Sequence, residues 1–234
     1  MKDKIKKFYD RVGKYGGWST VPASRVAEIF LEVTQPERIG FTALKPGLLA
    51  QAVDSEMTRV IQLQRLKGGT YTFLFGLSLT FVPYPYEPQL KWHLTQKSLN
   101  LDLCERPHLY WGESPQGREQ AEALQVTSML GEKCLQEEIQ RAWLGLHPLM
   151  KDWFKRTSSR DGILKRCDQH LARPRGGVQF LPGARLVKAF TLAKEGMRGA
   201  ATRELERFLE EYREGEEARK NLHKALDQII SETR

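Results

Sequence analysis

The residues from Val60 to Phe81 read VIQLQRLKGGTYTFLFGLSLTF, and the second half of this stretch alternates between two kinds of side chain. Large apolar residues occupy every second position, namely Tyr71, Phe73, Phe75, Leu77, Leu79 and Phe81. Successive side chains of a β-strand point to opposite faces, so the pattern predicts a strand with one face in the core of a sheet. Each large side chain stabilises the fold by about 1.5–3 kcal/mol when it is buried, which accounts for the pattern without a ligand.

A glycine pair separates this predicted strand from a second apolar segment. Residues 67–69 read KGG and lie between Arg59–Leu66 and Thr70–Val82. Glycine adopts the positive φ angles that tight hairpins require, so the two segments are expected to be antiparallel neighbours. Further strands are expected in residues 40–54, which lead into an acidic turn, and in residues 98–106.

Helical spacing of apolar residues appears on both sides of the predicted sheet. Residues 22–33 place apolar side chains three and four positions apart, after a proline that suits a first helical turn. The chain is again expected to be helical from about residue 115, where one stripe contains Leu135, Ile139, Trp143 and Leu146. Two more helices are expected at Leu186–Tyr212 and at about Glu216–Ile230.

Proline, glycine and serine mark the connections between these elements. Residues 82–88 read VPYPYEP, and an extended loop is expected because proline donates no backbone hydrogen bond. Residues 157–185 are expected to be irregular, with a short helix at Ile163–Leu171. The sequence therefore predicts an α+β fold: an N-terminal antiparallel sheet with flanking helices, then a mainly α-helical C-terminal half. The expected parts are a sheet domain at 1–112, a helical connector at 113–156, a basic linker at 157–185 and a helix pair at 186–234.

The composition is that of a globular protein. Of the 234 residues, 40% are hydrophobic and 28% are charged, and a chain of this length can bury a substantial core. No stretch reaches the roughly 18 uninterrupted apolar residues of a membrane span, and the N-terminus lacks the apolar segment of a secretory signal. The three cysteines, Cys104, Cys134 and Cys167, are sparse and odd in number, so reduced thiols and a cytoplasmic location are expected.

The common catalytic motifs are absent. The sequence contains no phosphate-binding loop, dinucleotide-binding turn, HExxH zinc helix or GxSxG elbow. Cys167 and His170 have the spacing of half a zinc site, but no second pair of ligands stands near them. Asp54, Glu56 and Lys67 offer a loosely spaced set of the kind that metal-dependent nucleases use. No cofactor, metal ligand or catalytic residue is predicted, and an uncharacterised hydrolase or nuclease is the second alternative function.

The net charge of +8 is concentrated in two segments. Residues 1–14 contain six basic and two acidic residues, and residues 155–188 contain nine basic and two acidic ones. Residues 1–14 also have helical spacing, which favours a terminal helix packed on the core over a basic arm. A concentrated basic patch attracts polyanions, so residues 155–188 indicate nucleic-acid binding as the first alternative function.

Candidate phosphate contacts in this segment are Arg160, Lys165, Arg166, Arg173 and Arg175. About five such contacts predict a slope of roughly −4 to −5 for the logarithm of the duplex-DNA binding constant against the logarithm of salt concentration. The same cations could instead pair with the acidic terminal helices, which contain Glu204, Glu206, Glu210, Glu211, Glu214, Glu216 and Glu217. The sequence leaves both alternatives open.

A protein partner is the interaction that the sequence favours first. Without catalytic motifs, the chain is expected to be a non-catalytic interaction protein, such as bacteria use in toxin neutralisation or phage defence. Candidate partner-binding residues are Tyr84 and Tyr86 in the proline-rich loop and Gln62 and Gln64 on one face of a strand. Alternatively, the tyrosines fold onto the sheet edge and the glutamines lie on a solvent-facing side of the sheet. The oligomeric state is not predicted.

Two short patterns resemble known families. The order of a helix, a Gly-Phe pair, a strand ending in Gln plus a basic residue, and an aromatic strand entering a small residue resembles an uncharacterised bacterial domain-of-unknown-function family. The matching residues are Gly40, Phe41, Gln64, Arg65, Phe73 and Gly76, within about residues 22–105. The resemblance implies an α+β sheet domain and no known activity. Residues 192–209 are weakly similar to a tetratricopeptide helix pair, although one copy does not make a repeat array.

Overall fold

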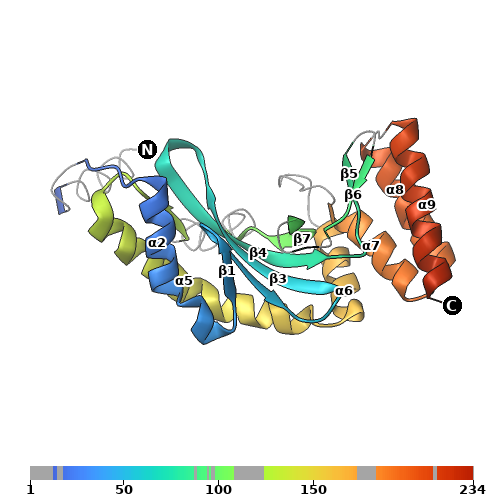
Figure 1. Ribbon diagram of the computed structural model, residues 1–234, viewed down its shortest axis with the longest axis horizontal. Helices are drawn as coiled ribbons and strands as arrows, with labels where there is room; N and C mark the ends of the chain where they lie inside the picture. The colour runs from blue at the N-terminus through green and yellow to red at the C-terminus, as the bar shows by residue number, and fades with distance from the viewer. Residues whose placement is uncertain are drawn as a thin grey trace. The chain divides into compact units, whose positions relative to one another are not determined.

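The protein has an α+β fold, as the sequence predicts. The structure is a computed structural model and describes residues 13–14, 18–86, 89–93, 95, 98–107, 124–172, 183–212 and 215–233. It contains an antiparallel sheet in the N-terminal half and helices that lie mostly in the C-terminal half (Figure 1). The helix predicted in residues 1–14 lies almost entirely outside the described residues.

The chain divides into two compact units, and each unit collects separate stretches of sequence. Unit 1 comprises the described residues within Met1–Gln51, Ile61–Phe75 and Glu105–Lys151. Unit 2 comprises those within Ala52–Val60, Gly76–Cys104 and Asp152–Arg234. The linear domain boundaries expected from the sequence stay predictions.

In the described part of the chain, six strands form the main sheet, in the order β1-β2-β3-β4-β7 with β8 paired to β4. Their bounds are β1 (Thr42–Lys45), β2 (Leu48–Ala52), β3 (Met57–Arg65), β4 (Thr70–Leu79), β7 (Leu103–Glu105) and β8 (Gln125–Thr127). A short 3-10 turn, η2 (Lys67–Gly69), joins β3 to β4 with φ angles of 70° at Gly68 and 68° at Gly69. The predicted glycine-mediated hairpin is therefore confirmed, because Gly68 and Gly69 adopt the positive φ angles that the turn requires.

The alternating strand β4 is buried on both of its faces. Tyr71, Phe73 and Leu77 of the apolar parity are at most 7% exposed, and Thr72 and Ser78 of the opposite parity are at most 1% exposed. The strand is central in the sheet, with β3 on one side and β7 and β8 on the other. The alternation in the sequence therefore reflects larger side chains on one face of β4 and smaller ones on the other. It does not mark a face that is exposed to solvent.

One glycine of β4 is required by close packing. A Cβ atom at Gly76 would lie 2.2 Å from the Leu103 carbonyl oxygen and 2.7 Å from the Cys104 Cα. Any larger residue would push β7 away from β4, so the small residue after the aromatic run has a packing role.

Among the described residues, helices α2 and α5 cover the part of the sheet that belongs to unit 1. Helix α2 (Ala23–Thr34) follows Pro22 and buries Phe30, whose ring centroid lies 5.8 Å from that of Phe73. Helix α5 (Gly131–Arg156) runs through Pro148 without a break, and its predicted stripe is buried. Trp143 of this stripe places its ring 6.1 Å from that of Phe73. Both helix predictions are confirmed, and the aromatic strand is the common packing surface.

The described residues of unit 2 form further helices: α6 (Arg160–Leu171), α7 (Gly183–Lys194), α8 (Arg198–Tyr212) and α9 (Glu216–Glu232). Helix α7 packs against α6, α8 and α9, and seven of its residues from Leu186 to Ala193 are buried (Figure 1). A helix that is apolar around most of its circumference belongs in the centre of a bundle. Helix α9 also packs against two short strands, β5 (Tyr84–Tyr86) and β6 (Gln89–Lys91).

Three sequence-based expectations differ from the structure. The proline-rich loop is a strand, because β5 pairs antiparallel with β6. Pro85 sits opposite Leu90, and alternate positions of an antiparallel pair need no backbone hydrogen bond, so a proline fits there. Strand β8 lies in the region expected to be helical and pairs with β4.

The segment expected to be one helix at Leu186–Tyr212 is two helices. Helix α7 ends in a Schellman motif, in which Gly196 has a φ of 71°. There Met197 N–H donates to the Leu192 carbonyl and Gly196 N–H to the Ala193 carbonyl. The apolar period continues through this turn, so periodicity alone did not reveal the break.

None of the helices formed by described residues combines the length and the apolar character that a membrane-spanning segment needs.

Candidate functional site

A basic hollow lies where α5 turns into α6, and all of its lining residues belong to unit 2. We name it the elbow hollow. It has a volume of about 370 Å³ and is lined by Trp153, Arg156, Thr157, Ser159, Asp161, Gly162, Lys165, Arg166 and Gln169.

Short polar side chains build the elbow. At the end of α5, the Thr157 hydroxyl donates to the Trp153 carbonyl at 2.9 Å. Ser159 caps α6, because its side-chain oxygen accepts a hydrogen bond of 3.2 Å from the Gly162 N–H. A Cβ atom at Gly162 would lie 1.9 Å from the Arg156 carbonyl oxygen. The close approach of the two helices therefore requires glycine at this position.

Among the described residues, three cations and one carboxylate line the hollow. Arg156 pairs with Asp152 at 2.8 Å and Lys165 pairs with Asp161 at 2.7 Å, and the two cationic side chains are 76% and 72% exposed. Arg166 donates to the Gln169 side-chain oxygen at 2.6 Å. The two exposed ion pairs, Arg156–Asp152 and Lys165–Asp161, each contribute at most about 1 kcal/mol to stability. The N-terminus of α6 adds partial positive charge.

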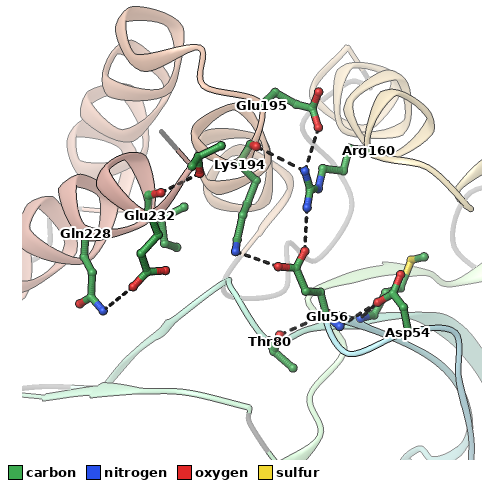
Figure 2. A network of polar contacts seen from close by, with 11 residues as sticks. Asp54, Glu56, Thr80, Arg160, Lys194, Glu195, Gln228 and Glu232 are labelled. Atoms are coloured by element: carbon green, nitrogen blue, oxygen red, sulfur yellow. Dashed lines mark hydrogen bonds and ion pairs between the residues drawn. The ribbon is translucent and has the colours of Figure 1, made fainter.

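Arg160, a predicted phosphate contact, is engaged with other parts of unit 2. Figure 2 shows its guanidinium bonded to Glu56 at 2.8 Å, to Glu195 at 3.2 Å and to the Lys194 carbonyl oxygen at 3.3 Å. Lys194 also binds Glu56, at 2.8 Å. Partial burial raises the pKa of Glu56, but the hydrogen bonds from Lys194 and Arg160 outweigh it and lower the pKa. Arg160 therefore holds the turn before β3 against α6 and α7.

Two other cations of the basic segment pair with the acidic terminal helices. Arg185 binds Glu204 at 2.9 Å and Glu211 at 2.8 Å, and Lys188 binds Glu204 at 3.1 Å and Asp168 at 2.8 Å. The Glu204 side chain is only 9% exposed. Arg185 and Lys188 are not among the five candidate phosphate contacts, so these ion pairs do not decide between the two alternatives that the sequence left open for those five residues. Arg173 and Arg175 lie outside the described residues.

The candidate partner-binding residues fall into different units. Gln62 and Gln64 are half-buried on β3 in unit 1, and Gln64 Oε1 is buried without a hydrogen-bond partner among the described residues. Tyr84 of β5 is half-buried in unit 2, with its ring edge-on to His93 at 6.2 Å. Tyr86 belongs to the same strand, and its side chain lies outside the described part of the structure.

A second hollow in unit 1 was missed by sequence reasoning. It has a volume of about 410 Å³ and lies between the end of α2, the 3-10 helix η1 (Pro36–Ile39) and α5. Leu144 lines it and is 66% exposed, beside Trp143. The available signal was that Leu144 falls off the buried stripe of α5. Nothing in the described residues identifies what binds there.

The sequence patterns that suggested metal chemistry have other roles here. Asp54 accepts hydrogen bonds from the N–H groups of Glu56 and Met57 and so forms the acidic turn before β3. Burial raises the pKa of the Cys167 thiol well above its usual value. Within the described part of the chain, no three or more His, Cys, Asp or Glu side chains are grouped so as to hold a metal ion.

Comparison with known proteins gives no relatives. No protein-family model, curated protein or solved structure matches this chain. The resemblance to a domain-of-unknown-function family therefore stays a prediction.

Proposed function

We propose that this protein binds another macromolecule without catalysing a reaction, and that the elbow hollow binds the phosphate backbone of a nucleic acid. The observation that carries the proposal is the convergence of Arg156, Lys165 and Arg166 on one hollow at the start of a helix. Phosphate groups are bound by such combinations of cationic side chains and helix N-termini.

The number of contacts predicts the strength of the salt dependence. Each phosphate neutralised on duplex DNA contributes about −0.9 to the slope of log K against log salt concentration. Three cations in the hollow predict a slope of about −2.7. This slope is shallower than the slope for five contacts, because Arg160 is engaged elsewhere and Arg173 and Arg175 lie outside the described residues. Contacts of this type carry no base sequence information, so binding is expected to tolerate changes of sequence.

The test is a titration of the protein against a labelled 20-base-pair duplex and the matching single strand at several salt concentrations. A variant with Arg156→Gln, Lys165→Gln and Arg166→Gln removes the cations of the hollow. A matched control with Lys133→Gln, Lys151→Gln and Arg198→Gln removes three cations that lie outside it, so both variants have the same net charge.

We expect the hollow variant to lose the salt-dependent binding and the control variant to retain most of it. Equal losses in both variants would mean that the overall charge attracts the nucleic acid, and not the hollow. Absence of binding by the unmodified protein at low salt would overturn the proposal and leave a protein partner as the macromolecule to seek.

A further inference from the structure

Two titratable side chains face each other inside unit 2, away from the elbow hollow. Asp102 lies directly before β7, and His93 follows β6. The Asp102 side chain is 0% exposed and the His93 side chain is 10% exposed. Asp102 is fixed on β4, because its Oδ2 accepts a 2.6 Å hydrogen bond from Leu79 N–H while its own N–H donates to the Leu77 carbonyl.

The hydrogen bonds of His93 define which ring nitrogen carries its hydrogen. His93 Nδ1 bonds to the Ser98 carbonyl oxygen, which can only accept, so the hydrogen is on Nδ1. Nε2 of the neutral ring is then an acceptor. This atom lies 3.9 Å from Asp102 Oδ1, and neither atom has a hydrogen-bond partner among the described residues.

Both facing atoms would be bare lone pairs if Asp102 were ionised and His93 neutral. Buried polar atoms without hydrogen bonds are strongly disfavoured, and a buried anion without a counter-charge more so. One added proton resolves the conflict, because a protonated carboxyl group donates to Nε2 and a protonated imidazole donates to Oδ1.

The neighbouring charges do not alter this conclusion. Burial raises the pKa of Asp102. The hydrogen bond from Leu79 N–H opposes this shift, and so does the nearby side-chain amide of Asn100, although its Nδ2 makes no hydrogen bond of normal geometry to Asp102 Oδ1. Burial lowers the pKa of His93, and only its bond to Ser98 opposes that shift. Tyr84 of β5 meets the His93 ring with its edge. No charged side chain of the described elements contributes to the pKa shift of Asp102 or of His93. The side chains that do not contribute include Lys91 on β6, Glu105 on β7, Arg106 after β7 and the ionised residues of α9.

We propose that His93 and Asp102 form a single-proton site, in which the fold retains one proton between Asp102 Oδ1 and His93 Nε2. The orientation excludes a role as a general base for an outside substrate. Nδ1 is held by Ser98 and Nε2 points at Asp102, so the imidazole presents neither nitrogen to solvent.

The site predicts a specific dependence of stability on pH. Between about pH 4 and pH 6.5 the unfolded chain also holds one proton, on His93, so stability does not change on account of this pair. Above about pH 6.5 the unfolded chain releases that proton and the folded site keeps its own. The folded state then binds more protons than the unfolded state, so the unfolding constant rises about tenfold per pH unit until the folded site deprotonates.

The signs of the two shifts agree with this result. Folding raises the pKa of Asp102, so this residue contributes stability to the folded state. The contribution is fully present below the pKa of Asp102 in the unfolded chain and is lost as the pH rises through its pKa in the folded protein. Folding lowers the pKa of His93, so this residue also contributes stability. The contribution is present above the pKa of His93 in the unfolded chain and is lost as the pH falls through its pKa in the folded protein. The two effects cancel between the two unfolded values, which gives the flat region.

The decisive variant is Asp102→Asn, in which the amide imitates the protonated carboxyl group. Its oxygen can accept from Leu79 N–H and its NH₂ group can donate to His93 Nε2. The unfolding constant is measured by urea denaturation from pH 5 to pH 9, with Asp227→Asn on the exposed face of α9 as the control.

We expect the ratio of the unfolding constants of the unmodified protein and Asp102→Asn to rise about tenfold per pH unit from pH 5 until the folded site deprotonates, because the unfolded His93 is common to both proteins and cancels in the ratio. The corresponding ratio for Asp227→Asn is expected to stay constant. A ratio for Asp102→Asn that stays constant from pH 6 to pH 9 would overturn the proposal.

Carbon-13 NMR of the Asp102 carboxyl group and nitrogen-15 NMR of the His93 ring test the same site in the unmodified protein. At pH 7 we expect a protonated carboxyl group and a ring with hydrogen on Nδ1 only, or a doubly protonated ring beside a carboxylate. A carboxyl group that ionises near pH 4 beside a neutral ring would overturn the proposal, even if the variant failed to fold.

Discussion

Unit 2 uses its basic side chains in two ways. Arg160, Arg185 and Lys188 each contact at least two acidic residues, and we call them the tied cations. Arg156, Lys165 and Arg166 surround the elbow hollow, and we call them the hollow cations. The side chains of Arg185 and Lys188 are 18% and 20% exposed, whereas those of Arg156 and Lys165 are more than 70% exposed.

For Arg185 and Lys188, the difference from the hollow cations lies in the shared acidic partner Glu204 more than in the cations themselves. Glu204 is held on α8 in a nearly buried position, where hydrogen bonds to charged groups are stronger than in water. Asp152 and Asp161 are exposed, and their ion pairs join residues one helical turn apart. A cation beside a fixed, buried carboxylate stabilises the fold, whereas one beside an exposed carboxylate remains accessible to an external anion.

The largest effect on stability is expected from a substitution that disrupts the elbow between α5 and α6. Gly162→Ala places a methyl group against the Arg156 carbonyl oxygen, and we expect a loss of about 3 kcal/mol in the free energy of unfolding. The hollow would be deformed as well. Urea denaturation measures the change, and Gly145→Ala is the matched control, because an added Cβ there meets no atom within 4 Å. Gly145→Ala should stabilise α5 by up to about 1 kcal/mol. Equal effects of both variants would show that the close approach of the helices is unimportant.

An intermediate effect is expected from the tied cations. Glu204→Gln weakens hydrogen bonds from Arg185 and Lys188, and a loss of about 2 kcal/mol is expected near pH 7. Burial raises the pKa of Glu204, but the hydrogen bonds from Lys188 and Arg185 lower it by more. The pKa of Glu204 is therefore lower in the folded protein than in the unfolded chain. The stabilisation is therefore present above the unfolded pKa of about 4.3 and is lost as the pH falls through the folded value.

Chemical denaturation at pH 7 and pH 3 checks this prediction. Glu206→Gln is the control, because Glu206 is 48% exposed and pairs with His223. A gap between Glu204→Gln and the unmodified protein that is as large at pH 3 as at pH 7 would contradict the electrostatic explanation.

The smallest effect on stability is expected at the hollow cations. Asp161→Asn removes the carboxylate that pairs with Lys165, and the free energy of unfolding should change by no more than about 0.5 kcal/mol. Nucleic-acid affinity should increase severalfold at low salt, because the hollow loses its only lining carboxylate among the described residues. An affinity of Asp161→Asn for nucleic acid that stays the same or falls would show that the hollow is not part of the binding surface.

The sequence identified part of the candidate site. A high density of cations in residues 155–188 predicted a basic patch, and Lys165 and Arg166 do line the hollow. It could not separate them from Arg160, because Glu56 is more than 100 residues away and meets Arg160 only in the fold. The pair formed by His93 and Asp102 gave no signal although the two residues are close in sequence, because their facing depends on how β6 and β7 are placed.

The sequence by itself determined the local features of this protein: the alternating strand β4, the KGG turn, the amphipathic stripes of α2 and α5, and the α+β class. These follow from side-chain periodicity and backbone sterics over a few residues. Only the tertiary structure decided that β4 is covered on both faces, that α7 is the central helix, and which cations pair with acidic residues distant in sequence. Those properties depend on contacts between residues that are distant in sequence, and no local pattern encodes which distant residues meet.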